Sequence, residues 1–446
     1  MNPITLPSKD GLTHIAVRGD TLLSNQQWWQ RLYSVYQQVN ETPHQKWLLF
    51  ADDSFDFSCC LFALLLAGRT PILPPNQQYE TLVSFQTRVD AVCSDKNIGK
   101  QAPDVYIGKS YANHQQNSNA IAVAVNHDTE LHLYTSGSTG EPKCVVKKWR
   151  QLLAEVETLE TYFSKYVADS LICSSVSHQH IYGLLFTVLW PLLSQKKWQV
   201  KSVKYPEDYS SLTEGQAISF ISSPSFLEYV LAQPNLTSCA PQFCVSSGGL
   251  LKTVTAEGLA DLWGQAPTEV FGSSETGGVA YRNQQQHRHW RVFSCIEWTV
   301  SANQALQIRS PYLVNSHDWY VMDDAVEVRN DGFALVGRLD RVVKVAEKRV
   351  CLEQMANQLL QHHWVKSCDL ITLSLKREHI AAVVVLNHEG RQALSLGKRS
   401  LNNQLRQHLT AYFEAVTVPR KWRYVDSLPV NLQGKRQLNQ MRALFL

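Results

Sequence analysis

The stretch YTSGSTGEPK, residues 134–143, constrains this chain more than any other because its composition suits close contact with an anion. Residues 136–140 within it are all Ser, Thr or Gly. Glycines let backbone N–H groups approach an anion, hydroxyls add hydrogen-bond donors, and Lys143 adds a positive charge at the end of the stretch. The alternating segment before it, residues 121–133, predicts a buried strand. The sequence therefore predicts a strand followed by a loop, and the loop would hold a polyphosphate.

Two other interpretations of this stretch can be weighed at once. A P-loop ends in Gly-Lys-Ser/Thr, whereas here Pro142 precedes Lys143 and Cys144 follows it, so the P-loop is excluded. Taken alone, a run of Ser, Thr and Gly is more often a solvated linker. The phosphate interpretation therefore requires further parts of a nucleotide site elsewhere in the chain.

The composition predicts a large globular chain and excludes some partners. With 446 residues, 44% of them apolar, the chain can form a large core and a smaller second domain. A net charge of +3 without a long basic run predicts no nucleic acid partner. The ten cysteines include no CxxC pair, and the adjacent Cys59 and Cys60 in an apolar helical run predict reduced, buried thiols.

The amino terminus and the apolar runs predict a protein that stays in the cytoplasm. The first eleven residues lack the basic and apolar regions of a signal peptide, so we expect no export. The longest apolar run, residues 181–193, contains Gly183, Thr187 and Pro191 and is too short to span a bilayer. We expect it to form a buried helix, and we expect no membrane span in the chain.

Hydrophobic periodicity predicts alternating helices and strands as far as about residue 271. Strands are expected at residues 46–50, 171–176, 198–203, 217–221, 243–246 and 269–271. Helices are expected at residues 23–39, 55–67, 149–167, 182–193, 225–232 and 253–263, with 149–167 directly after the phosphate loop. This alternation predicts parallel sheets covered by helices, whose ligands bind at the carboxyl ends of the strands.

From about Trp290 the pattern becomes all-β, with strands expected at residues 292–300, 306–309, 320–328 and 333–336. A mixed segment of about one hundred residues, a usual size for a small domain, follows Asp340. We therefore predict an α/β fold with a large N-terminal domain, residues 1–339, of mostly parallel sheets plus a β-rich subdomain. A small α+β C-terminal domain would comprise residues 340–446.

Two more glycine-rich blocks follow predicted strands, VSSGGLL at residues 245–251 and VFGSSETGG at residues 270–278. We expect both to open on the same sheet edge as the phosphate loop, and the second carries a single carboxylate, Glu275. The nucleotide and a metal ion could meet at this edge of the sheet. Each block alone is more often a tight connection between a strand and a helix.

These blocks resemble those of the adenylate-forming superfamily, which comprises acyl- and aryl-CoA synthetases, peptide-synthetase adenylation domains and luciferases. Three further blocks carry the resemblance: HQHIYG at residues 178–183, DWYVMDDAVEVRNDGFALVGRLDRVVK at 318–344, and LPVNLQGKRQLNQMRALF at 428–445. The blocks occur in the family order between residues 46 and 442. The resemblance implies that the C-terminal domain is mobile and turns on the hinge residue Asp340.

The resemblance also implies roles for individual residues. The phosphates would be held by Thr135, Ser136, Gly137, Ser138, Thr139, Gly140 and Lys143. Gly248 and Gly249 would border the adenine, Phe271 would stack on it, and Gly272 and Ser274 would complete the loop in which Glu275 helps to hold Mg²⁺. Asp324 would bind the ribose and Arg338 would lie near it. Lys435 would reach the α-phosphate and the substrate carboxylate, and His180 would border the acyl site.

Some positions depart from the family pattern. Met322-Asp323 replaces the usual Thr-Gly before Asp324, and Glu347 replaces a glycine that gives a pantetheine arm room to pass. Glu347 is compatible with a rearranged tunnel, a different thiol donor or a weak thioester-forming step. His178 and His180 could suggest a metal, but no Cys or carboxylate lies nearby at ligand spacing.

The implied reaction uses ATP and Mg²⁺ to convert a carboxylic acid to an acyl-adenylate, from which a thiol displaces AMP. The thiol would belong to coenzyme A or to a separate acyl carrier protein. The compact chain resembles stand-alone ligases of aryl polyene or fatty-acid-type clusters, and Tyr182, Phe186 and Phe226 would suit an aromatic or short acyl group. A catalytically impaired homologue that only binds nucleotide, or a non-enzymatic scaffold, remains an alternative.

Overall fold

The chain forms two compact units, each described here by itself. The computed structural model describes residues 5–95, 104–106, 124–136, 142–205, 207–209, 216–233, 240–345, 348–374, 378–430 and 436–446. The N-terminal unit comprises Met1–Glu297 and Arg309–Asp318, and the C-terminal unit comprises Trp298–Ile308 and Trp319–Leu446. Packing thus groups part of the β-rich segment with the C-terminal unit. The predicted domain boundary at Asp340 separates segments that would move as rigid bodies, which packing alone does not test. This boundary therefore stays a prediction.

The larger sheet of the N-terminal unit has nine strands in the order β15-β14-β13-β12-β11-β9-β10-β1-β2. The six central strands are all parallel to one another: β13, β12, β11, β9, β10 and β1. Strands β2, β14 and β15 are antiparallel to their neighbours. Their bounds are β1 His14–Arg18, β2 Thr21–Ser24, β9 Leu171–Ser174, β10 Trp198–Gln199, β11 Ile218–Ser222, β12 Phe243–Ser246, β13 Thr268–Ser273, β14 Gly277–Asn283 and β15 Arg291–Val292.

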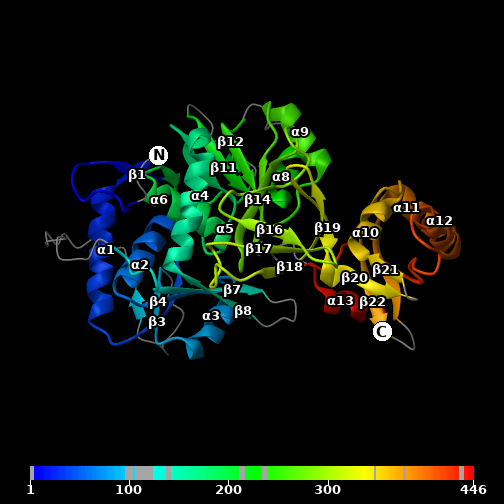
Figure 1. Cartoon of the computed structure of the whole chain (residues 1–446), viewed down its shortest axis with the longest axis horizontal. Helices are drawn as coiled ribbons and strands as arrows, with labels where there is room; N and C mark the ends of the chain where they lie inside the picture. Colours follow the sequence, from blue (N-terminus) through cyan, green and yellow to red (C-terminus); the bar gives the residue numbers. More distant parts are fainter. Residues whose placement is uncertain are drawn as a thin grey trace. The chain divides into compact units, whose positions relative to one another are not determined.

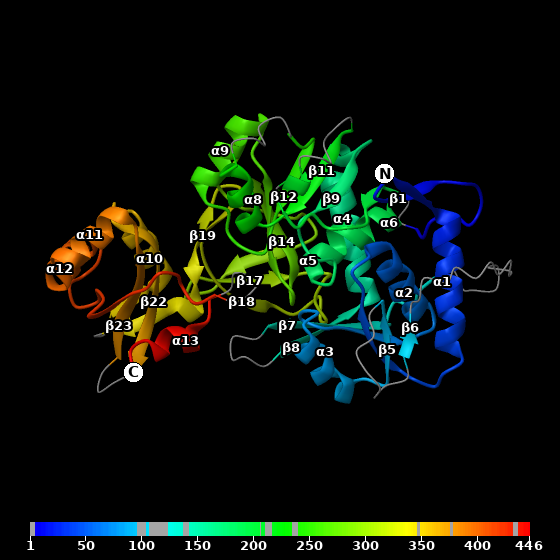
Figure 2. The ribbon, with the colours of Figure 1, turned by 180° about the vertical axis from the view of Figure 1, so that it is seen from behind.

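Two helices cover one face of this sheet. Helices α8, Pro224–Leu231, and α9, Thr253–Trp263, lie together beside β12 in both ribbon views (Figures 1 and 2). Leu227, Val230 and Leu259 from these helices are fully buried in one cluster with Phe220 of β11 and Cys244 of β12. The apolar faces predicted from the 3.6-residue period therefore face the sheet.

The smaller sheet of this unit has six strands in the order β6-β5-β3-β4-β7-β8, all parallel except β8. Their bounds are β3 Lys46–Phe50, β4 Thr70–Leu73, β5 Ala91–Ser94, β6 Asp104–Tyr106, β7 Glu130–Ser136 and β8 Pro142–Lys148. Helix α2, Ser54–Leu66, lies against β3 and β4 (Figure 1), and its N-cap Asp53 accepts hydrogen bonds from the backbone N–H groups of Phe55 and Asp56. Helices α1, Asn25–Asn40, and α3, Tyr79–Phe85, belong to the same unit. The prediction of mostly parallel sheets is confirmed.

Of two predictions about the segment around residue 134, the strand is present but begins later than expected, and the direct connection from loop to helix is wrong. Of the strand expected at residues 121–133, residues 121–123 lie outside the described part, and residues 124–129 form a turn before β7 begins at Glu130. Asn126 closes this turn by accepting hydrogen bonds from Asp128 N and Thr129 N. Strand β8 separates the loop from helix α4, Trp149–Val167, which was expected to follow the loop directly. The several lysines of β8 hide its strand pattern.

The apolar run at residues 181–193 is a buried helix with an irregular centre. It consists of α5, Ile181–Leu184, a π-helical turn, Leu185–Leu189, and α6, Trp190–Leu193. Pro191 lacks the N–H that a regular helix needs four residues after Thr187, and a π turn accommodates such a break. Cys59 and Cys60 are fully buried free thiols, and burial raises their pKa values. None of the helices in the described ranges is long and apolar enough to cross a bilayer.

The C-terminal unit combines small sheets with helices. Strands β16 Glu297–Val300, β17 Ala305–Arg309, β18 Tyr320–Arg329 and β19 Gly332–Arg338 form one sheet, β20 Val342–Val345 and β21 Lys348–Cys351 a hairpin, and β22 Val365–Ser374, β23 Glu378–Leu386 and β24 Lys421–Tyr424 another sheet. The helices are α10 Leu352–Leu360, α11 His388–Leu396, α12 Lys398–Thr410 and α13 Leu438–Ala443. The single strand expected at residues 292–300 is two separate strands, β15 and β16.

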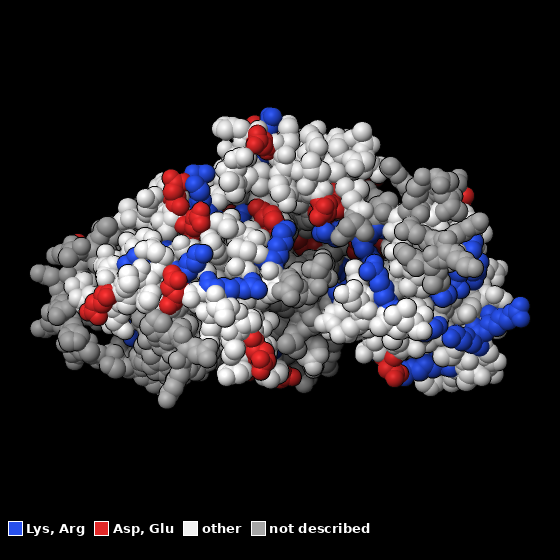
Figure 3. Space-filling model, turned by 90° about the horizontal axis from the view of Figure 1, so that it is seen from below, with Lys and Arg blue, Asp and Glu red and all other residues white. Residues whose placement is uncertain are grey.

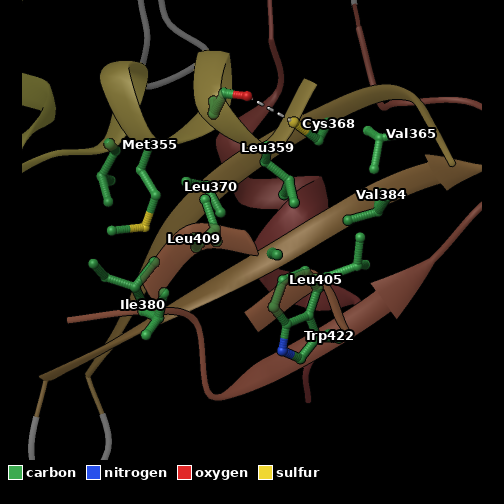
Figure 4. Packing of buried hydrophobic residues seen from close by; sticks show 14 of the residues in the cluster. Met355, Leu359, Val365, Cys368, Leu370, Ile380, Val384, Leu405, Leu409 and Trp422 are labelled. Carbon is green, nitrogen blue, oxygen red and sulfur yellow. Dashed lines mark hydrogen bonds between the residues drawn. The ribbon is translucent and has the colours of Figure 1, made fainter. Parts of the chain in front are cut away.

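The core of this unit lies between helices and the sheet of β22, β23 and β24 (Figure 4). Met355 and Leu359 of α10 and Leu405 and Leu409 of α12 are fully buried against this sheet, where Trp422 is 3% exposed. Cys368 donates to Ala356 O at 3.3 Å. The predicted α+β character of residues 340–446 is therefore confirmed.

Candidate functional site

The predicted phosphate loop connects β7 to β8 as a hairpin. The two strands are antiparallel, and Thr135 lies opposite Lys143 in their register. Gly137, Ser138, Thr139 and Gly140 lie outside the described residues. The structure therefore defines the two ends of the loop, and Lys143 stands on the strand that leaves it.

The turn that carries Glu275 connects β13 to β14. Its ends are held by reciprocal hydrogen bonds, from Ser273 N to Thr276 Oγ1 at 3.0 Å and from Thr276 N to Ser273 Oγ at 3.2 Å. A Cβ added at Gly272 would lie 2.0 Å from Gly277 O, so the strands can approach this closely only at a glycine. The glycines of this block thus shape a tight turn that holds Glu275 and the neighbouring Ser274 between the strands.

The structure brings Lys143 and Glu275 together from separate sequence blocks. Lys143 Nζ lies 2.6 Å from Glu275 Oε1, and the side chains are 61% and 28% exposed, so the pair remains open to solvent. Burial alone would raise the pKa of Glu275, but the hydrogen bond and charge of Lys143 lower it overall. Glu275 is therefore an ionised carboxylate beside the end of the predicted phosphate loop.

The two loops reach this point from different sheets. Lys143 is on β8 of the six-stranded sheet, whereas Glu275 follows β13 of the nine-stranded sheet. The prediction that all three loops open on one sheet edge is wrong, because the alternating pattern shows which segments are strands and not which sheet each joins. The predicted meeting of the first and third blocks is nevertheless present.

The second block lies beside the third, on adjacent parallel strands. Gly248 and Gly249 are exposed at the carboxyl end of β12, next to β13. Ser247 Oγ donates to Val270 O at 2.7 Å and ties the two segments together. The half-buried ring of Phe271 lies 5.5 Å from the ring of Trp290. These two glycine-rich blocks do share one sheet edge.

The HQHIYG block packs against the same part of the nine-stranded sheet. Tyr182 Oη donates to Ser222 O and Val245 O, both at 3.0 Å, at the ends of β11 and β12. His180 occupies the N-cap position of α5 and is half-buried. The neighbouring His178 is buried, its Nε2 lies 2.9 Å from Ala51 O, and burial lowers its pKa to about 4. His178 therefore has a structural partner in the backbone.

The remaining predicted residues belong to the C-terminal unit. Asp324 on β18 lies opposite Arg338 on β19, and Arg338 Nη2 is 3.3 Å from Asp323 Oδ2. Asp340 lies in the 3₁₀ turn Leu339–Arg341. Lys435 and Glu347 lie outside the described residues. Their roles, and those of Asp324, Arg338 and Asp340, stay predictions.

The residues around Glu275 are compatible with Mg²⁺. This ion prefers oxygen ligands and is usually bound by one or two carboxylates together with substrate phosphates and several waters. Glu275 supplies one ionised carboxylate next to the phosphate loop. The described part of the chain contains no group of three or more His, Cys, Asp or Glu side chains that could hold a metal ion.

The sequence interpretation missed two buried charged residues beneath this turn, Lys147 of β8 and Glu155 of α4. They are 1% and 3% exposed. If β8 had been recognised as a strand, the sequence would have indicated that Lys147 is buried. Lys147 follows Val145 two residues later, so both side chains lie on the inward face of the strand. Charged residues are almost never fully buried unless they are paired.

Comparison with known proteins identifies the family. The sequence profile of the AMP-binding enzymes matches residues 81–314, more than half of the chain. The chain therefore belongs to the AMP-binding enzyme family, and the resemblance to adenylate-forming enzymes is confirmed.

Individual relatives agree with this assignment. The chain is 26% identical over 324 residues to a 4-coumarate–CoA ligase of Rhodobacter capsulatus, covering 68% of this chain and 73% of the relative. It is 24% identical over 355 residues to a D-alanine–D-alanyl carrier protein ligase of Staphylococcus haemolyticus, covering 70% and 71%. The crystal structure of ATP-bound MatB from Rhodopseudomonas palustris has the same fold, with a TM-score of 0.80, 16% identity, and coverage of 99% of this chain and 96% of that one.

Proposed function

We propose that this protein is an AMP-forming acid–thiol ligase, which activates a carboxylic acid with ATP and transfers the acyl group to a thiol. The observation that carries the proposal is the contact between Lys143 and Glu275 at 2.6 Å, because it joins two blocks that are 132 residues apart in the chain. Membership of the AMP-binding family supports the use of ATP. The relatives named above, a CoA ligase and a carrier protein ligase, support the acid–thiol reaction.

In the first step, a carboxylate oxygen forms a bond to the α-phosphorus of ATP, and the bond from that phosphorus to pyrophosphate breaks. The residues position the reactants and balance charge, since phosphoryl transfer offers side chains little covalent chemistry. Lys143 and the loop of residues 136–140 would hold the phosphates, and Glu275 would hold Mg²⁺ against them. Mg²⁺, when bound, neutralises charge that develops on the leaving pyrophosphate. Asp324 would bind the ribose through two hydrogen bonds.

Lys435 would act at the reacting atoms themselves. The substrate carboxylate and the α-phosphate are both anionic, and an ammonium placed between them lowers their repulsion as charge redistributes. In the second step, the thiol sulfur forms a bond to the acyl carbon, the bond to AMP breaks, and the thiol proton is released. His180 would border this acyl site.

The thiol donor is anionic in this proposal, either coenzyme A or a carrier protein. Residues 340–446 contain 17 Lys and Arg against 8 Asp and Glu. Blue side chains predominate over the described surface of the C-terminal unit on the face shown in Figure 3. A positive surface raises the rate at which an anionic partner arrives.

The acid is aromatic or short in this proposal. Tyr182 packs on Phe186 with ring centroids 5.1 Å apart, and Phe226 packs on Phe220 at 5.7 Å. Phe186 is 2% exposed, so Tyr182 and Phe226, which are half-buried, are better placed to contact an acyl group.

Release of pyrophosphate in the presence of candidate acids tests the proposal. The purified chain would be incubated with ATP, Mg²⁺ and a panel of aromatic and aliphatic acids, and each positive acid would be repeated with coenzyme A and with a phosphopantetheinylated carrier protein. We expect acid-dependent pyrophosphate release, followed by AMP release when the correct thiol is added. ATP binding without pyrophosphate release from any acid would favour the impaired homologue suggested by Glu347 and Met322-Asp323. Failure to bind ATP with Mg²⁺ would favour a scaffold.

A further inference from the structure

Two buried charged side chains hold the turn that carries Glu275 from below. Lys147 Nζ donates to Glu275 O at 2.9 Å and to Tyr312 O at 3.0 Å. Glu155 Oε2 accepts from Gly278 N at 3.2 Å, and its Oε1 lies 4.0 Å from Lys147 Nζ. The pair therefore contacts the turn on both sides of its tip, at residue 275 and at residue 278.

Strand β8 contacts Glu275 twice. Lys143 and Lys147 are four residues apart on this strand, so both side chains lie on the same face of it. Lys143 binds the carboxylate of Glu275, and Lys147 binds its main-chain carbonyl. The position of this one carboxylate is thus tied to β8 at its side chain and at its backbone.

Helix α4 supplies the other half of the support. Gln151, Glu155 and Thr158 recur at helical spacing and form a polar stripe on a mostly apolar inner face. Gln151 Nε2 donates to Tyr312 O at 2.6 Å, and Thr158 Oγ1 contacts Tyr312 Oη. The stripe therefore fixes Tyr312, whose carbonyl is the second acceptor of Lys147.

The turn lies close against Glu155. Gly277 has φ +68°, and a Cβ added there would lie 2.5 Å from the Glu155 carboxylate. Only glycine adopts this conformation readily and also leaves room for the carboxylate. The glycine that follows Glu275 and Thr276 therefore serves the contact with Glu155 as well as the turn.

Burial makes this arrangement costly. It lowers the pKa of Lys147, an effect that Glu155 and Glu275 oppose, and it raises the pKa of Glu155, which Lys147 opposes. A well-packed apolar pair in place of a buried ion pair is often neutral or stabilising, so such a pair is weak evidence of a role in stability. The hydrogen bonds to the main chain of residues 275 and 278 indicate a different role for the pair, which is to hold the turn in place.

We propose that Lys147 and Glu155 are positioning residues, which fix the Glu275 carboxylate where Mg²⁺ and the phosphates of ATP meet. The inference rests on the proposed function, because it takes Glu275 as the Mg²⁺ ligand. Lys147 binds the carbonyl of Glu275 and Glu155 binds the N–H of Gly278, so both ends of this segment of the turn are restrained. Residues that orient a metal ligand typically change metal affinity about 10- to 100-fold when they are replaced.

The test measures ATP binding, by calorimetry or tryptophan fluorescence, as a function of Mg²⁺ concentration. In Lys147→Met, which keeps the length of the side chain but removes its charge and donors, we expect the Mg²⁺ concentration for half-maximal enhancement of ATP binding to rise about tenfold or more. ATP binding in EDTA should change less than twofold, because the loop and the adenine site are untouched.

A double variant separates positioning from folding. Lys147→Met alone leaves Glu155 buried without its partner and destabilises the fold, whereas Lys147→Met with Glu155→Gln removes both charges and keeps an acceptor for Gly278 N. We expect the double variant to recover stability towards urea while its Mg²⁺ requirement stays raised. A double variant with the wild-type Mg²⁺ requirement would overturn the proposal.

Another largely buried ion pair that involves helix α4, through Glu160, provides the matched control. Lys196 Nζ lies 2.8 Å from Glu160 Oε2, and the two side chains are 12% and 4% exposed. Lys196→Met should therefore reduce stability without changing the Mg²⁺ requirement. An equal rise in both single variants would contradict a specific role for Lys147. ATP binding by the wild-type chain that does not respond to Mg²⁺ would instead overturn the assignment of Glu275, and with it the proposed function.

Discussion

Both units contain a buried cluster of charged side chains, but the clusters are built differently. In the N-terminal unit, Lys147 and Glu155 form a pair whose hydrogen bonds go to main-chain groups of other segments. In the C-terminal unit, the fully buried Asp369 on β22 contacts two guanidinium groups: Arg341 Nη2, and Arg436 Nε at 3.1 Å. One cluster therefore fixes the backbone of a turn, and the other joins side chains from distant parts of its unit.

The positions of the two arginines show what the second cluster connects. Arg341 follows Asp340, the predicted hinge residue, and Arg436 follows Lys435, the predicted adenylation lysine. Asp369 thus ties together the beginning and the end of the predicted small domain, so that a rotation at the hinge would carry the lysine segment with it. A fixed carboxylate suits the proposed role of Glu275 in the N-terminal unit, whereas the predicted hinge would require the C-terminal unit to transmit a movement. Variants in each unit can test this contrast.

The largest effect is expected for Lys435→Ala. Removal of a group that stabilises transition-state charge costs about 10³-fold in rate, so adenylate formation should nearly disappear. Transfer of the acyl group from a preformed adenylate to the thiol should stay largely intact, because the role proposed for Lys435 is confined to the first step. Pyrophosphate exchange and single-turnover thiol transfer measure the two steps, and an equal loss in both would contradict the assigned role.

Asp369→Ala should destabilise the C-terminal unit. The change leaves Arg341 and Arg436 without the buried carboxylate, and breaking a buried ion pair typically costs about 3 kcal/mol of unfolding free energy. Hydrogen exchange should quicken in β22 and in residues 436–446, with little change in the N-terminal unit. Asp426→Ala is the matched control, because the Asp426 side chain is fully exposed and 3.9 Å from Arg391. Exchange that quickens equally in both units would argue against a local role.

Glu275→Gln should weaken catalysis without unfolding the turn. The amide keeps the shape of the side chain and its main-chain contact with Lys147 but loses the charge for Mg²⁺ and Lys143. We expect adenylation to slow about 10²-fold, the lower end of the cost of removing an electrostatic contact at the reacting groups. Unfolding free energy should change little, because exposed ion pairs contribute little. Adenylation at the wild-type rate would remove Glu275 from the site.

The smallest effect concerns His178, which is buried with its Nε2 2.9 Å from the main-chain carbonyl of Ala51. Its pKa is lowered from 6.5 to about 4, so the unfolded chain binds the proton more readily than the folded one. The stability that neutral His178 contributes is fully present above pH 6.5 and is lost as the pH falls towards 4. Between pH 7.5 and 5 this corresponds to about 2 kcal/mol of unfolding free energy. Urea unfolding of the wild type and His178→Gln measures it, and parallel pH profiles would refute the buried neutral state.

Much of the fold could be predicted because hydrophobic periodicity is a local property. Helix α4, helix α9 and strands β3 and β12 begin and end at the residues expected from the pattern. Strands β1, β2 and β8 were missed. Strand β1 pairs with the distant β10, a contact that no local pattern reveals. Strands β2 and β8 pair with the preceding strands β1 and β7, and the lysines on β8 obscure its inward face.

The amino acid sequence by itself determined the residues available for chemistry: those of the predicted phosphate loop, the glycines that shape the turn around Glu275, and the order of blocks that resembles the family. Only the tertiary structure decided that Lys143 and Glu275 meet across two different sheets, and that Lys147 and Glu155 support the turn beneath them. The physical reason is that residue type and spacing determine local conformation and reactivity. Contacts between distant segments depend on which strands pair and which sheets pack together, and only the folded chain shows which groups a buried charge contacts.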